Sequence, residues 1–234
     1  MNSIIIKESS NIEARFILKS PELDNSDGKI TPVLGNFPVI APSQVHKSNI
    51  ITVTNENFSE YALPNVIESD GIFLKTSKAE ATLRFADCAP VLIFPDDEWA
   101  SENFSYAILL HSGFKGTVLN IVGKSLVLLK NISENALKSA NLWCGPCIAQ
   151  DDYPRDFDEW TEKALEKFSF NNVKTLDKKY YFDIKNEIKN QALKSGLNPE
   201  KIFISEINTF RDYRCYSYRR GDKFNRMILH VKIF

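Results

Sequence analysis

Two apolar runs, each broken by a short polar turn, constrain the fold of this chain more than any other feature. The first, TLRFADCAPVLIF at 82–94, is interrupted by three residues and a proline, which predicts a buried strand, a turn and a second strand. The second, AILLHSGFKG at 107–116, ends its apolar part at His111, after which a serine and two glycines break the strand. Turns at strand ends are where rigid scaffolds present functional side chains. We therefore expect the chemistry of the protein at these turns.

Helical spacing follows the second turn. Within residues 117–133 the apolar side chains recur every three or four positions, which is typical of a helix packed on one face. Another helix is predicted over 156–168, with Asp156 as its N-terminal cap. A third is predicted over 182–196, where Gly196 is a natural stop.

Strands are predicted at 201–207 and 226–234, near the end of the chain. Residues 21–43, rich in Pro, Asp, Asn, Ser and Gly, are predicted to form loop and short strand. Strands that alternate with helices favour an α+β fold, an α/β-type layered sandwich of mixed sheets flanked by helices. Hydrophobic residues make up 43% of the 234 positions and no linker separates two cores, so we expect one domain spanning 1–234.

The charge balance favours a small-molecule partner. The 29 Lys and Arg residues nearly cancel the 30 Asp and Glu residues, so no global field would attract nucleic acid or an anionic membrane surface. Near the N-terminus, only three consecutive isoleucines precede Lys7, which is far short of a signal peptide or a membrane span. We therefore expect a cytoplasmic protein without nucleic-acid or membrane partners, and the sequence leaves its oligomeric state open.

Four cysteines in a chain of this length are too few for a disulfide scaffold, and in a reducing cytosol they would be thiols or ligands. Two of them lie in the pentapeptide WCGPC at 143–147, which is identical to a thioredoxin active site. In thioredoxin this motif caps a helix that lowers the pKa of the first thiol. Here the motif is followed by IAQDDYP, which lacks the apolar spacing of a helix, so we do not expect a redox role.

Cys88, His46 and His111 are the candidate catalytic and metal-ligating residues. Each lies where a strand is predicted to end in a turn. Two imidazoles and a thiolate are good zinc ligands, and three protein ligands leave a fourth position for water or substrate. The residues alone leave two other interpretations open: a buried thiol with hydrogen-bonded histidines, or a Cys88 nucleophile with His111 as its base.

Six short motifs occur in the order that is typical of one family. They are His46, SDG at 69–71, FADCAPVLI at 85–93, HSGFKG at 111–116, GPCI at 145–148 and YSYRR at 216–220. The chain therefore resembles the YfiH-like or laccase-domain family, described as polyphenol oxidoreductases and as purine nucleoside phosphorylases. The resemblance spans roughly residues 44–226.

The resemblance implies a metal centre, a fold and an activity. It implies that His46, Cys88 and His111 bind zinc, with copper as the alternative, and that the fold is YfiH-like, related to cysteine hydrolases of the cytotoxic-necrotising-factor type. The implied reaction is phosphorolysis of adenosine, inosine, guanosine or methylthioadenosine to a base and a sugar 1-phosphate. Adenosine deamination is implied as a second activity.

Candidate substrate and phosphate ligands also follow from the motifs. They are Lys115, Arg219, Arg220 and Asp70. The chain departs from the family motif H-A-G-W-R-G at two positions, which read Phe114 and Lys115, and Lys lacks the planar two-pronged donor geometry of Arg. The Arg219-Arg220 pair is predicted either to bind an anion or to support the structure near the site.

Three other functions remain as alternatives: a Cys/His hydrolase or peptidoglycan-editing enzyme, a single-copper polyphenol oxidoreductase, and a non-catalytic metal-binding protein. Three histidines in the whole chain cannot supply the sites of a multicopper oxidase. A single copper in a His/His/Cys site is compatible with the sequence.

Overall fold

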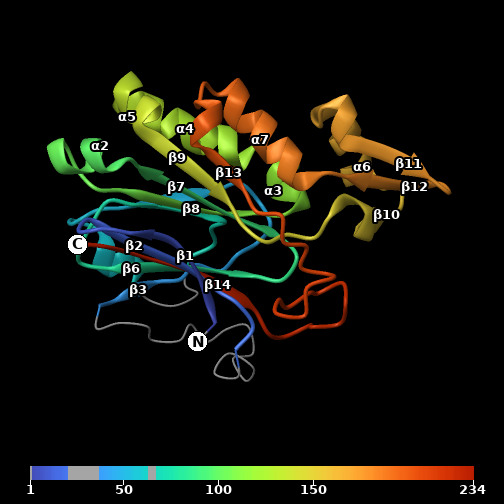
Figure 1. Cartoon of the computed structure of the whole chain (residues 1–234), viewed down its shortest axis with the longest axis horizontal. Helices are drawn as coiled ribbons and strands as arrows, with labels where there is room; N and C mark the ends of the chain where they lie inside the picture. The colour runs from blue at the N-terminus through green and yellow to red at the C-terminus, as the bar shows by residue number, and fades with distance from the viewer. Residues whose placement is uncertain (1, 21–36, 63–66) are drawn as a thin grey trace.

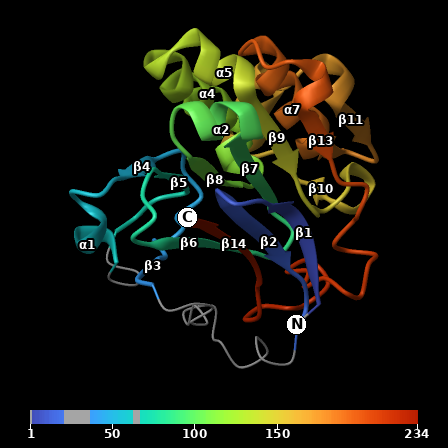
Figure 2. The ribbon, with the colours of Figure 1, turned by 60° about the vertical axis from the view of Figure 1, so that its left-hand side comes forward.

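Helices cover one face of a six-stranded sheet, and a five-stranded sheet packs against its other face (Figure 1). The same order of layers is visible after rotation (Figure 2). The structure is a computed structural model that describes residues 2–20, 37–62 and 67–234. The predicted layered architecture of mixed sheets flanked by helices is confirmed.

Both large sheets contain parallel and antiparallel pairs. The five-stranded sheet has the order β1 (Ser3–Glu8), β2 (Ile12–Ile17), β14 (Met227–Ile233), β6 (Glu80–Phe85) and β3 (Val39–Ile40). The six-stranded sheet has the order β13 (Ile202–Ile204), β9 (Ala140–Cys144), β7 (Ala89–Pro95), β8 (Ala107–Ser112), β5 (Gly71–Leu74) and β4 (Ile50–Val53). A small third sheet has the order β10 (Pro154–Arg155), β12 (Lys179–Phe182) and β11 (Val173–Leu176).

The helices lie mainly over the six-stranded sheet (Figure 1). They are α1 (Phe58–Tyr61), α2 (Asp97–Glu102), α3 (Phe114–Val118), α4 (Ile121–Ile132), α5 (Glu134–Ser139), α6 (Glu159–Lys167) and α7 (Ile184–Lys194). Short 3-10 turns occur at η2 (Gln150–Asp152), η3 (Phe170–Asn172) and η4 (Pro199–Lys201). In the described part of the chain, no helix is both long enough and apolar enough to cross a membrane.

Strand β7 shows why its sequence is a continuous apolar run. Val91 and Ile93 belong to the core cluster under the helices, whereas Leu92 and Phe94 belong to the cluster between the two sheets. Because side chains alternate across a strand, a strand covered on both faces must be apolar at every position. The strand, turn and strand predicted for 82–94 are therefore confirmed, as β6 and β7.

The helix predicted over 117–133 is divided in two. The chain turns at Asn120, whose φ of 57° lies in the left-handed region, between α3 and α4. The Asn120 side chain accepts a hydrogen bond from the backbone N–H of Gly123 at 3.1 Å and so caps α4. The prediction missed this break because the apolar spacing continues across it.

The prediction of the α6 cap was wrong by two residues. Asp158, not Asp156, caps the helix, and its carboxylate accepts the backbone N–H of Thr161 at 2.7 Å. Asp156 forms a surface ion pair with Lys179 instead. The helix α7 is confirmed, and Gly196 follows it with a φ of 92°, a conformation that favours glycine.

The two predicted C-terminal strands are confirmed as β13 and β14. Of the predicted loop and short strand at 21–43, the strand Val39–Ile40 is observed, and residues 21–36 lie outside the described residues. The N-terminal strands β1 and β2 were not predicted. They form a hairpin whose second strand pairs with β14.

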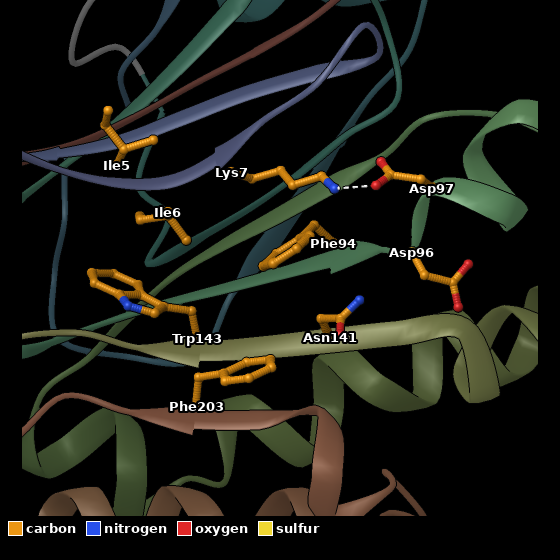
Figure 3. A pocket seen from close by; sticks show the side chains of 9 residues that line it. All are labelled: Ile5, Ile6, Lys7, Phe94, Asp96, Asp97, Asn141, Trp143 and Phe203. Atoms are coloured by element: carbon orange, nitrogen blue, oxygen red, sulfur yellow. Dashed lines mark hydrogen bonds and ion pairs between the residues drawn. The ribbon is translucent and has the colours of Figure 1, made fainter.

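A hollow of about 390 Å³ opens between β1 and the β9–β13 side of the other sheet (Figure 3). Its walls are mainly the apolar side chains of Ile5, Trp143 and Phe203, and Lys7 Nζ lies 2.6 Å from Asp97 at its side. None of the predicted site residues lines it. The functional candidates lie elsewhere, where the turn between β6 and β7 crosses from one large sheet to the other.

The reassigned cap provides a test of the fold. Replacing Asp158 with alanine should lower the free energy of unfolding by about 1 kcal/mol, because the α6 N-terminus loses its acceptor. Asp156→Ala is the matched control and should change it by less than about 0.5 kcal/mol, because that residue forms only an exposed ion pair. Urea unfolding of both variants measures the difference. A larger loss for Asp156→Ala would contradict the assignment.

Candidate metal centre

Three donor side chains from distant parts of the sequence converge at one end of the sheets. The ligand atoms of His46, Cys88 and His111 all lie within 4.8 Å of one another. The rings of His46 and His111 meet edge to face, with centroids 4.8 Å apart. His111 is buried and His46 is exposed, so the cluster is open to solvent on the side of His46. Such a donor set fits a zinc ion with a free coordination position.

The buried carboxylate of Asp70 holds the turn that carries His46. It accepts the backbone N–H of Val45 at 3.3 Å, of His46 at 2.9 Å and of Lys47 at 2.7 Å. His46 itself has a φ of 57°, in the left-handed region, which is uncommon for a residue with a side chain. The three hydrogen bonds stabilise this conformation and thereby orient the His46 ring.

The same carboxylate orients the second histidine. His111 Nδ1 lies 2.8 Å from Asp70 Oδ1, and both side chains are buried. If Nδ1 donates its proton to the carboxylate, Nε2 is left to accept a proton or bind a metal, as is usual for metal-ligating histidines. Burial raises the pKa of Asp70, but the hydrogen bonds from His111 and the backbone outweigh it, and the pKa lies below its ordinary value.

The electrostatics of the cluster favour a thiolate. Burial alone would raise the pKa of Cys88, but the charge and hydrogen bonds of His111 and His46 outweigh it and lower the pKa. For His111, burial lowers the pKa, but the Cys88 thiolate and Asp70 outweigh it and raise the pKa. A thiolate is the form of cysteine that binds metals and acts as a nucleophile.

Gly113 allows the close approach of Cys88 to the end of β8. A Cβ atom at position 113 would lie 2.5 Å from Cys88 Sγ and 3.8 Å from the His46 ring. Any side chain there would displace the sulfur. The glycine after His111-Ser112 is therefore required by the packing of the cluster.

Asp87 ties the Cys88 turn to the C-terminal segment. It has a φ of 78°. Its carboxylate accepts hydrogen bonds from the Thr209 hydroxyl at 2.7 Å, the Ser217 hydroxyl at 3.0 Å and the backbone N–H of Arg219 at 2.8 Å. The turn that carries the thiol and the segment that carries the predicted basic pair are thus held together.

The triad lies in a cleft of about 950 Å³. Cationic side chains around it are Arg84, Lys115, Arg155, Arg219, Lys223 and Arg226, and aromatic side chains are Phe114, Tyr153, Tyr218 and Phe224. The carboxylate among the lining residues is that of Asp87, which is already hydrogen-bonded. The cleft therefore suits a ligand that has an anionic group and a flat ring.

The predicted phosphate ligands lie in different surroundings. Lys115 and Arg219 line the cleft, with the Lys115 ammonium over the Trp160 ring at 4.8 Å and the Arg219 guanidinium over the Tyr153 ring at 4.9 Å.

Arg220 lies outside the cleft lining. Its guanidinium donates to the carbonyls of Thr209 and Phe210 at 3.1 Å each and pairs with Asp222. Of the two roles predicted for Arg220, these contacts correspond to structural support. Asp70 is fully buried beneath the two histidines.

Several residues of the cleft were not predicted. Arg84, Arg155, Arg226 and Tyr153 line it but belong to none of the recognised motifs. They come from three separate segments, around Arg84, Tyr153 to Arg155 and Arg226, and only tertiary contacts bring these together. No periodicity in the sequence marks them.

The WCGPC cysteines are not placed for redox chemistry. Cys144 ends β9, and no α-helix directly follows it in the described chain: Cys147 forms an isolated bridge with Asn208, and the short 3-10 turn η2 comes next. Both thiols are fully buried, and burial raises the pKa of Cys144 to about 12 and that of Cys147 well above its ordinary value. Thiols of this kind are poor nucleophiles.

Comparison with known proteins identifies relatives over almost the whole chain. A family model described as "Multi-copper polyphenol oxidoreductase laccase" matches residues 30–233. A purine nucleoside phosphorylase of Aquifex aeolicus is 24% identical over 227 residues, which cover 97% of this chain and 95% of that one. Another, from Rickettsia conorii, is 26% identical over 242 residues, which cover 97% and 92%.

Solved structures share the fold. The hypothetical protein YfiH of Bacillus licheniformis aligns with a TM-score of 0.80 at 19% identity, covering 99% of this chain and 96% of that one. YlmD from Geobacillus stearothermophilus aligns with a TM-score of 0.75 at 19% identity, covering 99% of each. The predicted YfiH-like fold is confirmed.

A conservative change at Asp70 tests its role beneath the metal centre. Asp70→Asn should lower zinc affinity roughly ten- to a hundredfold, because the histidine loses the carboxylate that orients it. The matched control is Glu80→Gln, which alters a second buried carboxylate–histidine pair, formed with His230 at 2.9 Å, neither residue of which lines the cleft. Competition with a chromophoric chelator measures both affinities. Equal losses in the two variants would contradict a specific role for Asp70.

The thiols provide a test that depends on pH. In metal-free protein, iodoacetamide should label Cys88 at pH values where an ordinary thiol, of pKa about 8.5, is mostly protonated, because the imidazoles lower its pKa. Labelling should slow as the pH falls through that lowered value. Cys144, Cys147 and Cys215 are buried with raised pKa values and should stay unlabelled in the native state.

Peptide mapping by mass spectrometry identifies the labelled thiol. Zinc added before the reagent should protect Cys88, since a coordinated thiolate is not free to react. The same labelling rate with and without zinc would count against Cys88 as a ligand.

Proposed function

We propose that this chain, which belongs to the family described as multi-copper polyphenol oxidoreductase laccase, is a metal-dependent purine nucleoside phosphorylase. The relatives from Aquifex aeolicus and Rickettsia conorii carry that name. The proposed substrates are adenosine, inosine, guanosine or methylthioadenosine together with phosphate. The observation that carries the proposal is the convergence of three metal donors in a cation-rich cleft of a size that suits a small ligand.

Zinc is the metal we propose, held by His46, Cys88 and His111. One thiolate and two imidazoles fit its tetrahedral preference and leave a position open. Copper is the alternative, because Cu(II) binds such donors more tightly. We do not propose a multicopper centre, despite the family name, because the chain has only three histidines. The third, His230, pairs with Glu80 within the five-stranded sheet.

The proposed phosphorolysis uses the cleft residues to hold two reactants. A phosphate oxygen attacks the anomeric carbon, the glycosidic bond breaks, and its electron pair leaves on the purine, which then takes up a proton. Lys115 and Arg219 offset the phosphate charge and orient it, and the aromatic side chains that line the cleft offer surfaces for the purine ring. Holding both reactants in one geometry is itself a large part of the proposed catalysis.

Adenosine deamination is proposed as a second activity of the same centre. Water adds to the ring carbon that carries the amino group, and ammonia leaves. When bound, the metal supplies a Lewis-acid charge and lowers the pKa of a coordinated water toward 7, roughly. The buried carboxylate of Asp70 keeps His111 oriented in either reaction.

A Cys/His hydrolase or peptidoglycan-editing enzyme is the second candidate, and one observation favours it. Cys88, His111 and Asp70 are arranged as a nucleophile, a base and an orienting carboxylate. His46 separates the two candidates, because the metal centre needs it and the hydrolase arrangement does not.

Incubation of zinc-loaded protein with inosine and phosphate should release hypoxanthine, which is measured by chromatography together with ribose 1-phosphate. His46→Gln should reduce this activity by more than about tenfold, because one of three ligands is lost. Lys47→Gln is the matched control, since its side chain pairs with Glu68 rather than lining the cleft.

No base release from any natural purine nucleoside would refute the proposed phosphorylase. Hydrolysis of a peptide or ester that survives His46→Gln but not Cys88→Ala would support the hydrolase instead.

A further inference from the structure

Arg226 lines the part of the cleft that lies next to the five-stranded sheet. It immediately precedes β14, whose first residue, Met227, pairs with Phe85 of β6. The turn that carries Cys88 leaves β6 at the same point, so Arg226 lies beside the metal centre. It lines the same cleft as the triad, whereas Phe114, Lys115 and Arg155 approach that cleft from the α3 and β10 side.

Main-chain carbonyls hold the Arg226 guanidinium in place. Nη1 donates to the carbonyl of Asn225 at 2.8 Å and to that of Asp222 at 3.4 Å, and Nη2 donates to that of Lys223 at 3.0 Å. These acceptors are neutral, so they fix the side chain without cancelling its charge. A guanidinium fixed in this way is preorganised, which reduces the entropy lost when a ligand binds.

The nearest carboxylates are already engaged elsewhere. Asp222 accepts the backbone N–H of Ser217 at 2.8 Å and pairs with Arg220 at 3.1 Å. Asp87 is held by Thr209, Ser217 and the backbone of Arg219. Within residues 2–20, 37–62 and 67–234, no carboxylate oxygen lies within 4 Å of the Arg226 guanidinium.

The surroundings of Arg226 disfavour an uncompensated charge. Burial lowers its pKa, although the Cys88 thiolate, Tyr218 and the nearby carboxylates oppose the effect. Arg84 lines the same cleft, and the charge of Arg226 acts, after burial, to lower the pKa of Arg84. A ligand anion bound beside Arg226 would offset the charge of its guanidinium.

Two other cations of the cleft, Arg155 and Lys223, have partners that differ from those of Arg226. Arg155 pairs with Asp158 at 2.9 Å and lies over the Phe114 ring at 4.0 Å. Lys223 lies over the Tyr218 ring at 3.7 Å and donates to the Tyr218 carbonyl. Arg226 differs from Arg155 because its hydrogen-bond acceptors are neutral, and it differs from Lys223 because it is half-buried rather than exposed.

We propose that Arg226 is a principal ligand of a phosphate group bound in this cleft. The inference rests on the proposed function for the chemistry of the ligand, and it names a residue that the motifs do not include. The phosphate group could belong to inorganic phosphate, the co-substrate, or to the 5′-phosphate of a nucleotide. Both present the same tetrahedral oxyanion, which a guanidinium binds through paired hydrogen bonds.

Isothermal titration of the zinc-loaded protein with inorganic phosphate, and separately with inosine 5′-monophosphate, tests the proposal. Arg226→Gln should weaken binding of at least one of them by about tenfold or more, because a charge-assisted hydrogen bond is lost. Arg226→Lys, which keeps the charge, should retain part of the affinity. Arg214→Gln is the matched control, since Arg214 is an exposed arginine paired with Asp212 outside the cleft.

The two ligands identify the source of the phosphate group. Arg226 is assigned to the co-substrate if the variant loses affinity for inorganic phosphate alone. Its KM for phosphate should then rise, while its KM for inosine stays within about twofold of the wild type. Loss confined to the nucleotide assigns Arg226 to the 5′-phosphate. Zinc content and thermal unfolding establish that each variant is intact, and Arg226→Lys serves where Arg226→Gln does not fold.

Unchanged affinity of Arg226→Gln for both ligands would overturn the proposal, as would the absence of binding of either ligand to the wild type. Binding that depends on Arg226 in a protein that releases no base from any nucleoside would refute the phosphorylase and leave this site standing. The opposite result is base release in which neither Arg226→Gln nor Arg226→Lys changes the phosphate KM or nucleotide binding. It would support the phosphorylase and refute the role of Arg226.

Discussion

The buried carboxylate of Asp70 is the interaction on which the arrangement of the site depends. It lies just before β5 and joins two segments that are separate in the sequence, the turn at 45–47 and the end of β8. A buried carboxylate is unfavourable unless hydrogen bonds compensate for the loss of water. Here three backbone N–H groups and the His111 ring provide that compensation, and these hydrogen bonds also orient two of the candidate metal donors. Stability and function therefore rest on the same contacts.

Asp87 plays a comparable part on the other side of the thiol. Its carboxylate holds two hydroxyl groups and one backbone N–H of the C-terminal segment. The Cys88 turn lies between these two carboxylates, and Gly113 leaves room for the sulfur. A cluster fixed by such contacts needs little rearrangement to accept a metal, which favours affinity because less conformational entropy is lost.

The sequence predicted the strands and turns that present the site, because burial on both faces of β7 leaves a continuous apolar run that is easy to recognise. It misplaced the α6 cap, because Asp156 and Asp158 have the same capping chemistry and only their tertiary contacts distinguish them. The residue types and their places at strand ends left several interpretations of the triad open, and family resemblance selected the metal site, since His46 and Cys88 are 42 positions apart and carry no spacing signal. Arg226 was missed because its role depends on the pairing of β14 with β6, which no local pattern reveals.

The distribution of charge explains why total composition is a weak guide to the ligand. The chain has a formal net charge of -1, yet six cationic side chains surround the cleft and its carboxylates lie beneath the floor or are hydrogen-bonded within it. Fields inside a cleft depend on local charges more than on the sum over the chain, because solvent and salt screen the distant ones. A cleft with cations at its walls and aromatic rings between them would concentrate a small anion beside a planar ligand. The interior of the cleft therefore suits a small ligand that carries a single phosphate group.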